Sequence, residues 1–104
     1  MKPLFFLGSS LVNLTAFPTE AKRAAGFQLR RVQAGFEPVD WKPLVSVGPG
    51  AMEIRIHAQG EWRVLYVAKF RDSVYVLHAF QKKTQKTPQT DIELARKRYR
   101  EVAP

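Results

Sequence analysis

Three apolar segments with strand character follow one another in the second half of the chain, separated by short connections. They span residues 52–57, 62–70 and 74–81, and the connections 58–61 and 71–73 are short enough for hairpins. A parallel pair of neighbouring strands would need a crossover of a dozen or more residues, so such tightly joined strands pair antiparallel. The sequence therefore predicts an antiparallel meander.

The first of these strands alternates between apolar and charged residues. Ile54 and Ile56 point to one face of the predicted sheet. The residues of opposite parity are Glu53, Arg55 and His57. We therefore expect one packed face and one charged face. The two later strands are apolar at both parities, so their faces are not resolved.

The N-terminal part of the chain predicts a strand and two helices. Residues 2–7 have the pattern of a short strand, and Ser9 or Ser10 can cap a helical turn that ends near residue 14. Pro18 suits the first turn of a longer helix, which Gly35 would terminate. The apolar stripe of this helix consists of Ala21, Ala25, Leu29 and Val32.

The remaining segments predict a long loop and a C-terminal helix. Residues 35–50 contain three prolines and three glycines, and we expect a surface loop whose anchors are Trp41, Leu44 and Val45. Thr87 can cap, and Pro88 can open, the last helix. Its apolar stripe is Ile92, Ala95, Tyr99 and Val102, and the surrounding basic residues are Arg96, Lys97, Arg98 and Arg100.

Together these elements predict a single α+β domain over residues 1–104. The expected architecture is a small antiparallel sheet, made of the N-terminal strand and the meander, packed with two N-terminal helices and one C-terminal helix. The chain has no cysteine, which excludes disulfides, thiolate metal sites and thiol catalysis and suits a reducing cytoplasm. No apolar run is long enough to span a membrane, so we expect a cytoplasmic protein without a membrane partner.

Positive charge is concentrated on the predicted sheet. The net charge is +8, and residues 55–86 contribute +5 of it, with seven basic and two acidic side chains. Cations clustered on a rigid sheet, with Lys82, Lys83 and Lys86 following its last strand, suit a polyanion such as nucleic acid. They also suit stabilisation of charge that develops during a reaction.

Arg55, His57, Arg63 and Lys82 would converge on one groove if the meander pairs in sequence order. RNA cleavage by the ribose 2′-hydroxyl needs a base, an acid and positive charge at the phosphate. A lysine crowded by cations has a lowered pKa and can carry protons near neutrality. His57 is an alternative proton carrier, whereas His78 lies in an apolar run and is more typical of a structural histidine.

Aromatic residues beside these cations suggest base stacking. Tyr66 and Phe80 are the candidates for RNA binding, together with Trp62 and Tyr75, although aromatics in a small sheet more often fill the core. The two histidines lack the spacing of a metal site, and no glycine-rich phosphate loop or nucleophile elbow is present. We therefore expect no metal and no small-molecule cofactor.

The order strand, two helices, meander and final helix, with EIRIHAQGEWRVLYV, VYVLHAFQKKTQKTP and IELARKR, resembles the RelE/HigB toxin superfamily. Its phage-derived HigB-like branch is the most similar. The resemblance implies a RelE-like fold and the toxin of a type II toxin–antitoxin pair. It further implies a metal-independent mRNA endonuclease that enters the ribosomal A site and inhibits translation. The implied partners are the ribosome, mRNA and a cognate antitoxin, often of helix-turn-helix type.

The resemblance also assigns roles to residues. Arg55, Arg63 and Lys82 match basic positions of the family, where Arg63 and Lys82 would neutralise the scissile phosphate and Arg55 would stabilise an oxygen. Lys83 and Lys86 would hold flanking phosphates. The general base and acid stay open, with His57 as a candidate. On this basis, removing Arg63 or Lys82 should abolish activity and leave stability nearly intact.

Two departures from the family and two alternative functions accompany this interpretation. Glu53 stands where some members have a second basic residue, and no tyrosine is found around Thr87, where some members have one. The same fold class includes ParE-like inhibitors of DNA gyrase, and a basic face would serve that partner too. A non-catalytic nucleic-acid-binding module is the third reading of the same charges.

Overall fold

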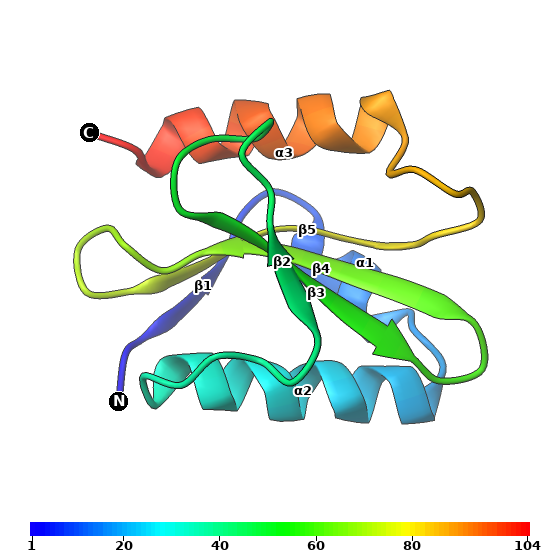
Figure 1. Cartoon of the computed structure of the whole chain (residues 1–104). Coiled ribbons are helices and arrows are strands. Elements are labelled where there is room, and N and C mark those ends of the chain that lie inside the picture. The colour runs from blue at the N-terminus through cyan, green and yellow to red at the C-terminus, as the bar shows by residue number, and fades with distance from the viewer.

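A computed structural model of the chain describes residues 1–104 as an α+β fold, in which a sheet lies between helices (Figure 1). Helix α2 covers one face of the sheet and α3 covers the other, while α1 packs beside β5. The elements are β1 (Leu4–Phe6), α1 (Ser10–Thr15), α2 (Thr19–Gln33), β2 (Trp41–Pro43), β3 (Ala51–His57), β4 (Glu61–Val67), β5 (Val74–Gln81) and α3 (Gln89–Val102). The predicted fold class is confirmed.

The sheet is larger than the sequence predicts and is not purely antiparallel. Its strand order is β1-β5-β4-β3-β2. The antiparallel meander β3-β4-β5 is confirmed, whereas β1 pairs with β5 in parallel. The expected surface loop over 35–50 contains β2, which pairs with β3 at the edge of the sheet. Pro43 is tolerated there because a strand edge does not need its missing N–H.

Both predicted helical stripes are buried. The stripe of α2 packs with Ile54, Ile56 and the other residues on that face of the sheet, and the stripe of α3 packs against the opposite face. Helix α2 ends as predicted at Gly35, whose φ is +92°. Gly35 and Phe36 donate backbone hydrogen bonds to the carbonyls of Val32 and Arg31, which is the Schellman pattern.

Four sequence-based expectations are wrong in detail. Val45 is 80% exposed and does not anchor its segment, a role taken by buried Leu44 and Val47. Arg98, which the sequence places among the basic residues around the apolar stripe of α3, is itself buried and donates to the carbonyl of Leu77 at 2.9 Å.

The other two concern the β5–α3 connection and the charged face. Pro88 rather than Thr87 precedes α3, and the Thr87 hydroxyl instead donates to Glu53. Glu53, expected on an open charged face, is fully buried. The face is covered because α3 and the β5–α3 connection lie over it (Figure 1). No helix of the structure combines the length and apolarity needed to cross a membrane.

Candidate functional site

The register of the meander brings the predicted basic residues together. Arg55 on β3 lies opposite Arg63 on β4, and Arg63 lies opposite Phe80 on β5. The N–H of Lys82 donates to the carbonyl of Glu61 at 2.7 Å, which extends the pairing by one step. Residues directly opposite each other share a face of the sheet. The expected convergence of Arg55, Arg63 and Lys82 on one side of the molecule is therefore present.

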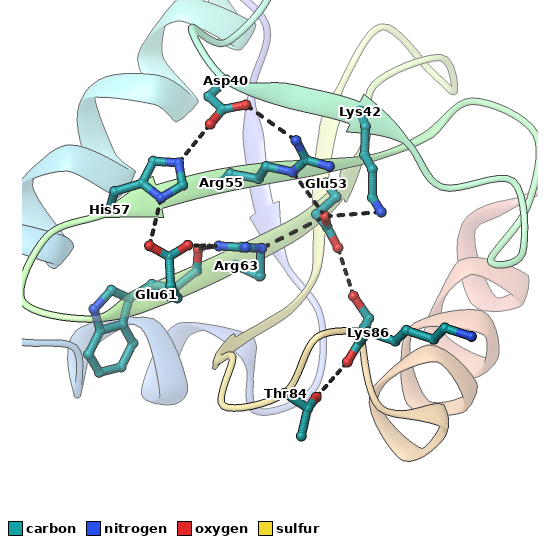
Figure 2. Close-up of polar contacts among 11 residues, drawn as sticks. Asp40, Lys42, Glu53, Arg55, His57, Glu61, Arg63, Thr84 and Lys86 are labelled. Carbon is teal, nitrogen blue, oxygen red and sulfur yellow. Dashed lines mark hydrogen bonds and ion pairs between the residues drawn. The ribbon is translucent and has the colours of Figure 1, made fainter.

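Carboxylates that the sequence did not predict as site residues alternate with these cations in a closed circuit, which we call the charge ring (Figure 2). In order around the circuit, its members are Asp40, His57, Glu61, Arg63, Glu53 and Arg55. Three members are acidic and three are basic, so the ring is neutral when His57 is protonated. Positive charge available to a ligand must therefore come largely from outside the ring.

His57 is held between two carboxylates. Its Nε2 lies 2.7 Å from Asp40 Oδ2, and its Nδ1 lies 2.7 Å from Glu61 Oε2. The hydrogen bond to Asp40, followed by the hydrogen bond to Glu61, raises the pKa of His57. The hydrogen bond to His57, followed by the hydrogen bond to Arg63, lowers the pKa of Glu61. An imidazolium that donates both protons has no lone pair with which to accept another. The candidate role of His57 as a general base does not fit this geometry.

Glu53 occupies the other side of the ring. Its Oε2 lies 3.6 Å from Arg55 Nε, 3.8 Å from Arg63 Nε and 3.8 Å from Lys42 Nζ. Its Oε1 accepts a hydrogen bond of 3.0 Å from the hydroxyl of Thr87. Three cations and one hydroxyl thus surround a single buried carboxylate. Arg55 also pairs with Asp40 at 3.7 Å, which closes the ring.

A polar depression of about 450 Å³ opens beside the ring, and its lining contains no apolar residue. The residues that line it are Glu61, Arg63, Lys82, Lys83, Thr84 and Gln85. Lys82, Lys83 and the nearby Lys86 make no ion pair with any carboxylate of the chain. Burial lowers the pKa of Lys82, and the Arg63 guanidinium lowers it further. Lys82 is thus an unpaired cation that gives up its proton more readily than an ordinary lysine.

The aromatic candidates separate into buried and accessible rings. Tyr66 is 5% exposed in the core beneath α2, on the face opposite the charge ring, and burial raises its pKa to about 12. Trp62 lies in the same core, with its ring centroid 4.7 Å from that of Phe17. The prediction that Tyr66 binds RNA is therefore wrong, because its ring lies in the core. Phe80 remains, because it is only half-buried and lies opposite Arg63.

His78 has the surroundings of a structural histidine. It is buried, its Nε2 lies 2.6 Å from Asp91 Oδ1, and its ring stacks on Phe80 with a centroid separation of 5.0 Å. Burial lowers its pKa in spite of the Asp91 carboxylate. The neutral ring therefore links β5 to the first turn of α3.

The three carboxylates of the ring are the residues that sequence reasoning missed. Two of them carried a usable signal, since Glu53 has the same parity as Arg55, and Glu61 the same parity as Arg63. Opposite charges two residues apart on a strand point to the same side, where they can pair. Asp40 carried no such signal, because it reaches Arg55 and His57 only through the unpredicted strand β2.

Comparison with known proteins places the chain in a family. The family model described as phage derived protein Gp49-like (DUF891) matches residues 13–100. This range leaves out β1, the first half of α1 and the last two residues of α3, and it includes all of the charge ring and the depression beside it. No curated protein shows significant similarity to the chain. The chain belongs to the Gp49-like family of phage-derived proteins, a family of RelE-like toxins of type II toxin–antitoxin systems.

Proposed function

We propose that this protein is a HigB-like toxin that cuts mRNA in the ribosomal A site and so inhibits translation. The family supports the toxin assignment and implies an antitoxin partner, for which we propose the helix-turn-helix type. The observation that carries the endonuclease proposal is the polar depression. There Lys82, whose pKa is lowered, lies beside the buried guanidinium of Arg63.

The chemistry that we propose is attack of the ribose 2′-oxygen on the adjacent phosphorus. A bond forms between these atoms, the bond from phosphorus to the 5′-oxygen breaks, the 2′-hydroxyl loses a proton and the departing 5′-oxygen gains one. Neutral Lys82 takes the proton of the 2′-hydroxyl, because its pKa is lowered and its amine has no partner in the protein, and the ammonium that forms gives a proton to the departing 5′-oxygen. Arg63 and Lys82 together offset the charge on the phosphate.

The other basic residues have supporting roles. Lys83 and Lys86 are exposed and unpaired, and we assign them to flanking phosphates. Arg55 lies behind Arg63 in the charge ring and acts by holding Asp40 and Glu53. Phe80 is the one predicted stacking residue that stays available to a base.

Glu61 gives the depression an internal competitor for the phosphate. Its Oε1 lies 3.0 Å from Arg63 Nη1, where a phosphate oxygen would otherwise bind. Its side chain is substantially exposed, so a phosphate can replace it without opening the core. We expect bound RNA to displace Glu61 from Arg63 and leave it with His57.

The proposal is tested by expressing the protein in growing cells and mapping cuts by primer extension. The protein should produce cuts within translated messages, and purified ribosomes carrying mRNA should give the same cuts. Lys82→Met should abolish them, because it removes the proton carrier. Lys22→Met removes an exposed lysine of α2 on the other face of the sheet and should leave cleavage unchanged.

Two other outcomes would reject the endonuclease. Broken DNA with an SOS response and intact messages would indicate a ParE-like gyrase inhibitor. Growth inhibition with neither kind of damage would indicate a non-catalytic nucleic-acid-binding module.

A further inference from the structure

Glu53 joins four separate parts of the structure through one buried carboxylate. Lys42 comes from β2, Arg63 from β4 and Thr87 from the β5–α3 connection, while Glu53 itself lies on β3 beside Arg55. In Figure 2 the side chains of Lys42, Arg55 and Arg63 point toward the Glu53 carboxylate.

The arrangement exceeds what neutralising one carboxylate requires. A buried carboxylate is costly unless it is paired, and a single cation would suffice for charge balance. Three cations lie within 3.8 Å of Glu53 Oε2, yet none is close enough to hydrogen-bond to it. Arg63 Nε is likewise buried without a hydrogen-bond partner. Glu53 therefore acts on these groups through charge and position rather than through hydrogen bonds to Oε2.

We propose that Glu53 is a positioning residue of the site, which fixes Arg63 and the lysine-bearing connection 82–88 relative to each other and partly offsets the cations around Lys82. The inference rests on the proposed function, because it gives Glu53 a part in the same reaction. Glu53 itself is fully buried and is not expected to touch RNA.

The positional part of this role follows from the two ends of the connection. At its start, the N–H of Lys82 is bonded to the carbonyl of Glu61 on β4. At its end, the Thr87 hydroxyl is bonded to Glu53 on β3. Lys83 and Lys86 lie between these two fixed points. Losing the Glu53 contact would free one end of the segment that carries them.

The electrostatic part follows from the charges that face Lys82. Arg63 on β4, Lys42 on β2 and Arg55 on β3 all lower the pKa of Lys82, whereas Glu53 raises it. Glu61 and Lys83 line the same depression. Replacing Glu53 by a neutral residue would remove the carboxylate that raises this pKa, so the pKa of Lys82 would fall further.

The first test is Glu53→Gln, which keeps the shape and an oxygen acceptor for Thr87. The titration of Lys82 is followed by NMR at its ε-carbon in the purified protein, and its midpoint should move to lower pH than in the wild type. The matched control is Glu101→Gln, an exposed carboxylate of α3 without polar contacts, which should leave the midpoint in place. A Lys82 midpoint that does not move in Glu53→Gln would overturn the electrostatic part.

The pH dependence of mRNA cleavage is a second measurement on Glu53→Gln. The limb of the wild-type pH–rate profile whose midpoint coincides with the NMR midpoint of Lys82 belongs to Lys82. Glu53→Gln should shift that limb to lower pH, in the direction of the NMR midpoint. If the wild type does not cleave mRNA at all, the proposed function fails, while the NMR titration still decides the role of Glu53.

The second test is Thr87→Val, which changes no charge and is suitable if Glu53→Gln does not fold. Amide resonances of residues 83–86 should shift and lose order, whereas the Lys82 midpoint should stay unchanged. KM for ribosomes carrying mRNA should rise about threefold to tenfold with little change in kcat, the range of one hydrogen bond. Thr90→Val, an exposed position on α3, is the control. Unchanged amide spectra in Thr87→Val would overturn the positional part.

Discussion

Among single residues, Arg63 and Lys82 differ in the number of contacts that their side chains make within the protein. Arg63 is 6% exposed and contacts Glu53, Glu61 and the carbonyl of Trp62. Lys82 has no side-chain partner in the protein. Loss of activity in an Arg63 variant could therefore result from lost stability, whereas in a Lys82 variant it could not. The sequence alone predicts that both variants stay stable, and from the contacts we now expect this only of the Lys82 variant.

Arg63→Ala should lower the free energy of unfolding by about 3 kcal/mol, because it leaves the buried Glu53 carboxylate with one cation fewer. Lys82→Ala should change it by less than about 0.5 kcal/mol. Urea denaturation of both variants beside the wild type measures the difference. Similar stabilities for the two variants would mean that Lys42 and Arg55 compensate Glu53 without Arg63.

The doubly bound His57 predicts a pH dependence of stability. The folded state raises the pKa of His57 above its ordinary 6.5, so its contribution is fully present below that pH. The contribution is lost as the pH rises through the higher pKa of the folded state. The stability advantage of the wild type over His57→Gln should therefore shrink with rising pH, as measured by urea denaturation across a pH series. An advantage independent of pH would show that His57 does not change its charge on unfolding.

Among the helices and strands, the local sequence pattern was sufficient to predict each element that buries one apolar stripe. The stripes of α2 and α3 follow from helical spacing, and β5 has the predicted bounds of Val74–Gln81. Strand β2 was missed because it has only three residues and includes a proline, so it carries no periodic signal. The parallel pairing of β1 was missed because its partner β5 is distant in the sequence.

The same difference between local sequence patterns and contacts between distant segments explains what could be predicted of the site. Basic residues on neighbouring strands indicated where positive charge would gather, and the register of the meander brings Arg55, Arg63 and Lys82 together. Their ion-pair partners depend on which strands pair and on what covers the sheet. Burial of Glu53 in particular results from Thr87 and its connection folding over β3, which no local pattern indicates.

The β5–α3 connection should determine much of the salt dependence of RNA binding. Lys83→Ala combined with Lys86→Ala removes two unpaired cations, so the slope of log K against log salt should become shallower by about 1.4 for single-stranded RNA. The slope is measured by titrating the protein with a labelled RNA oligonucleotide at several salt concentrations. Lys22→Ala combined with Lys97→Ala, an equal charge loss elsewhere, is the control. Equal slopes for the two double variants would argue that Lys83 and Lys86 face only solvent.

For the whole molecule, net charge and available charge are different quantities. The chain carries a formal charge of +8 with its histidines neutral, and the charge ring adds no positive charge to this total even when His57 is protonated. The cations left near the depression are lysines, which hold phosphate as point charges rather than through a paired fork. Under the proposed function, the net charge of the whole molecule attracts the RNA, and the ring orders the small area that binds it.

Parallel pairing of β1 with β5 has a consequence for synthesis. Leu4 pairs with Val74, and Ser9 accepts a hydrogen bond from Arg98, 89 residues further along the chain. Contacts this distant in sequence make folding slow and late, because the intervening chain must be closed into a loop first. A nascent chain cannot complete these contacts before Arg98 has been made. Under the proposed function, the translating ribosome has therefore passed Arg98 before the toxin acquires its native structure.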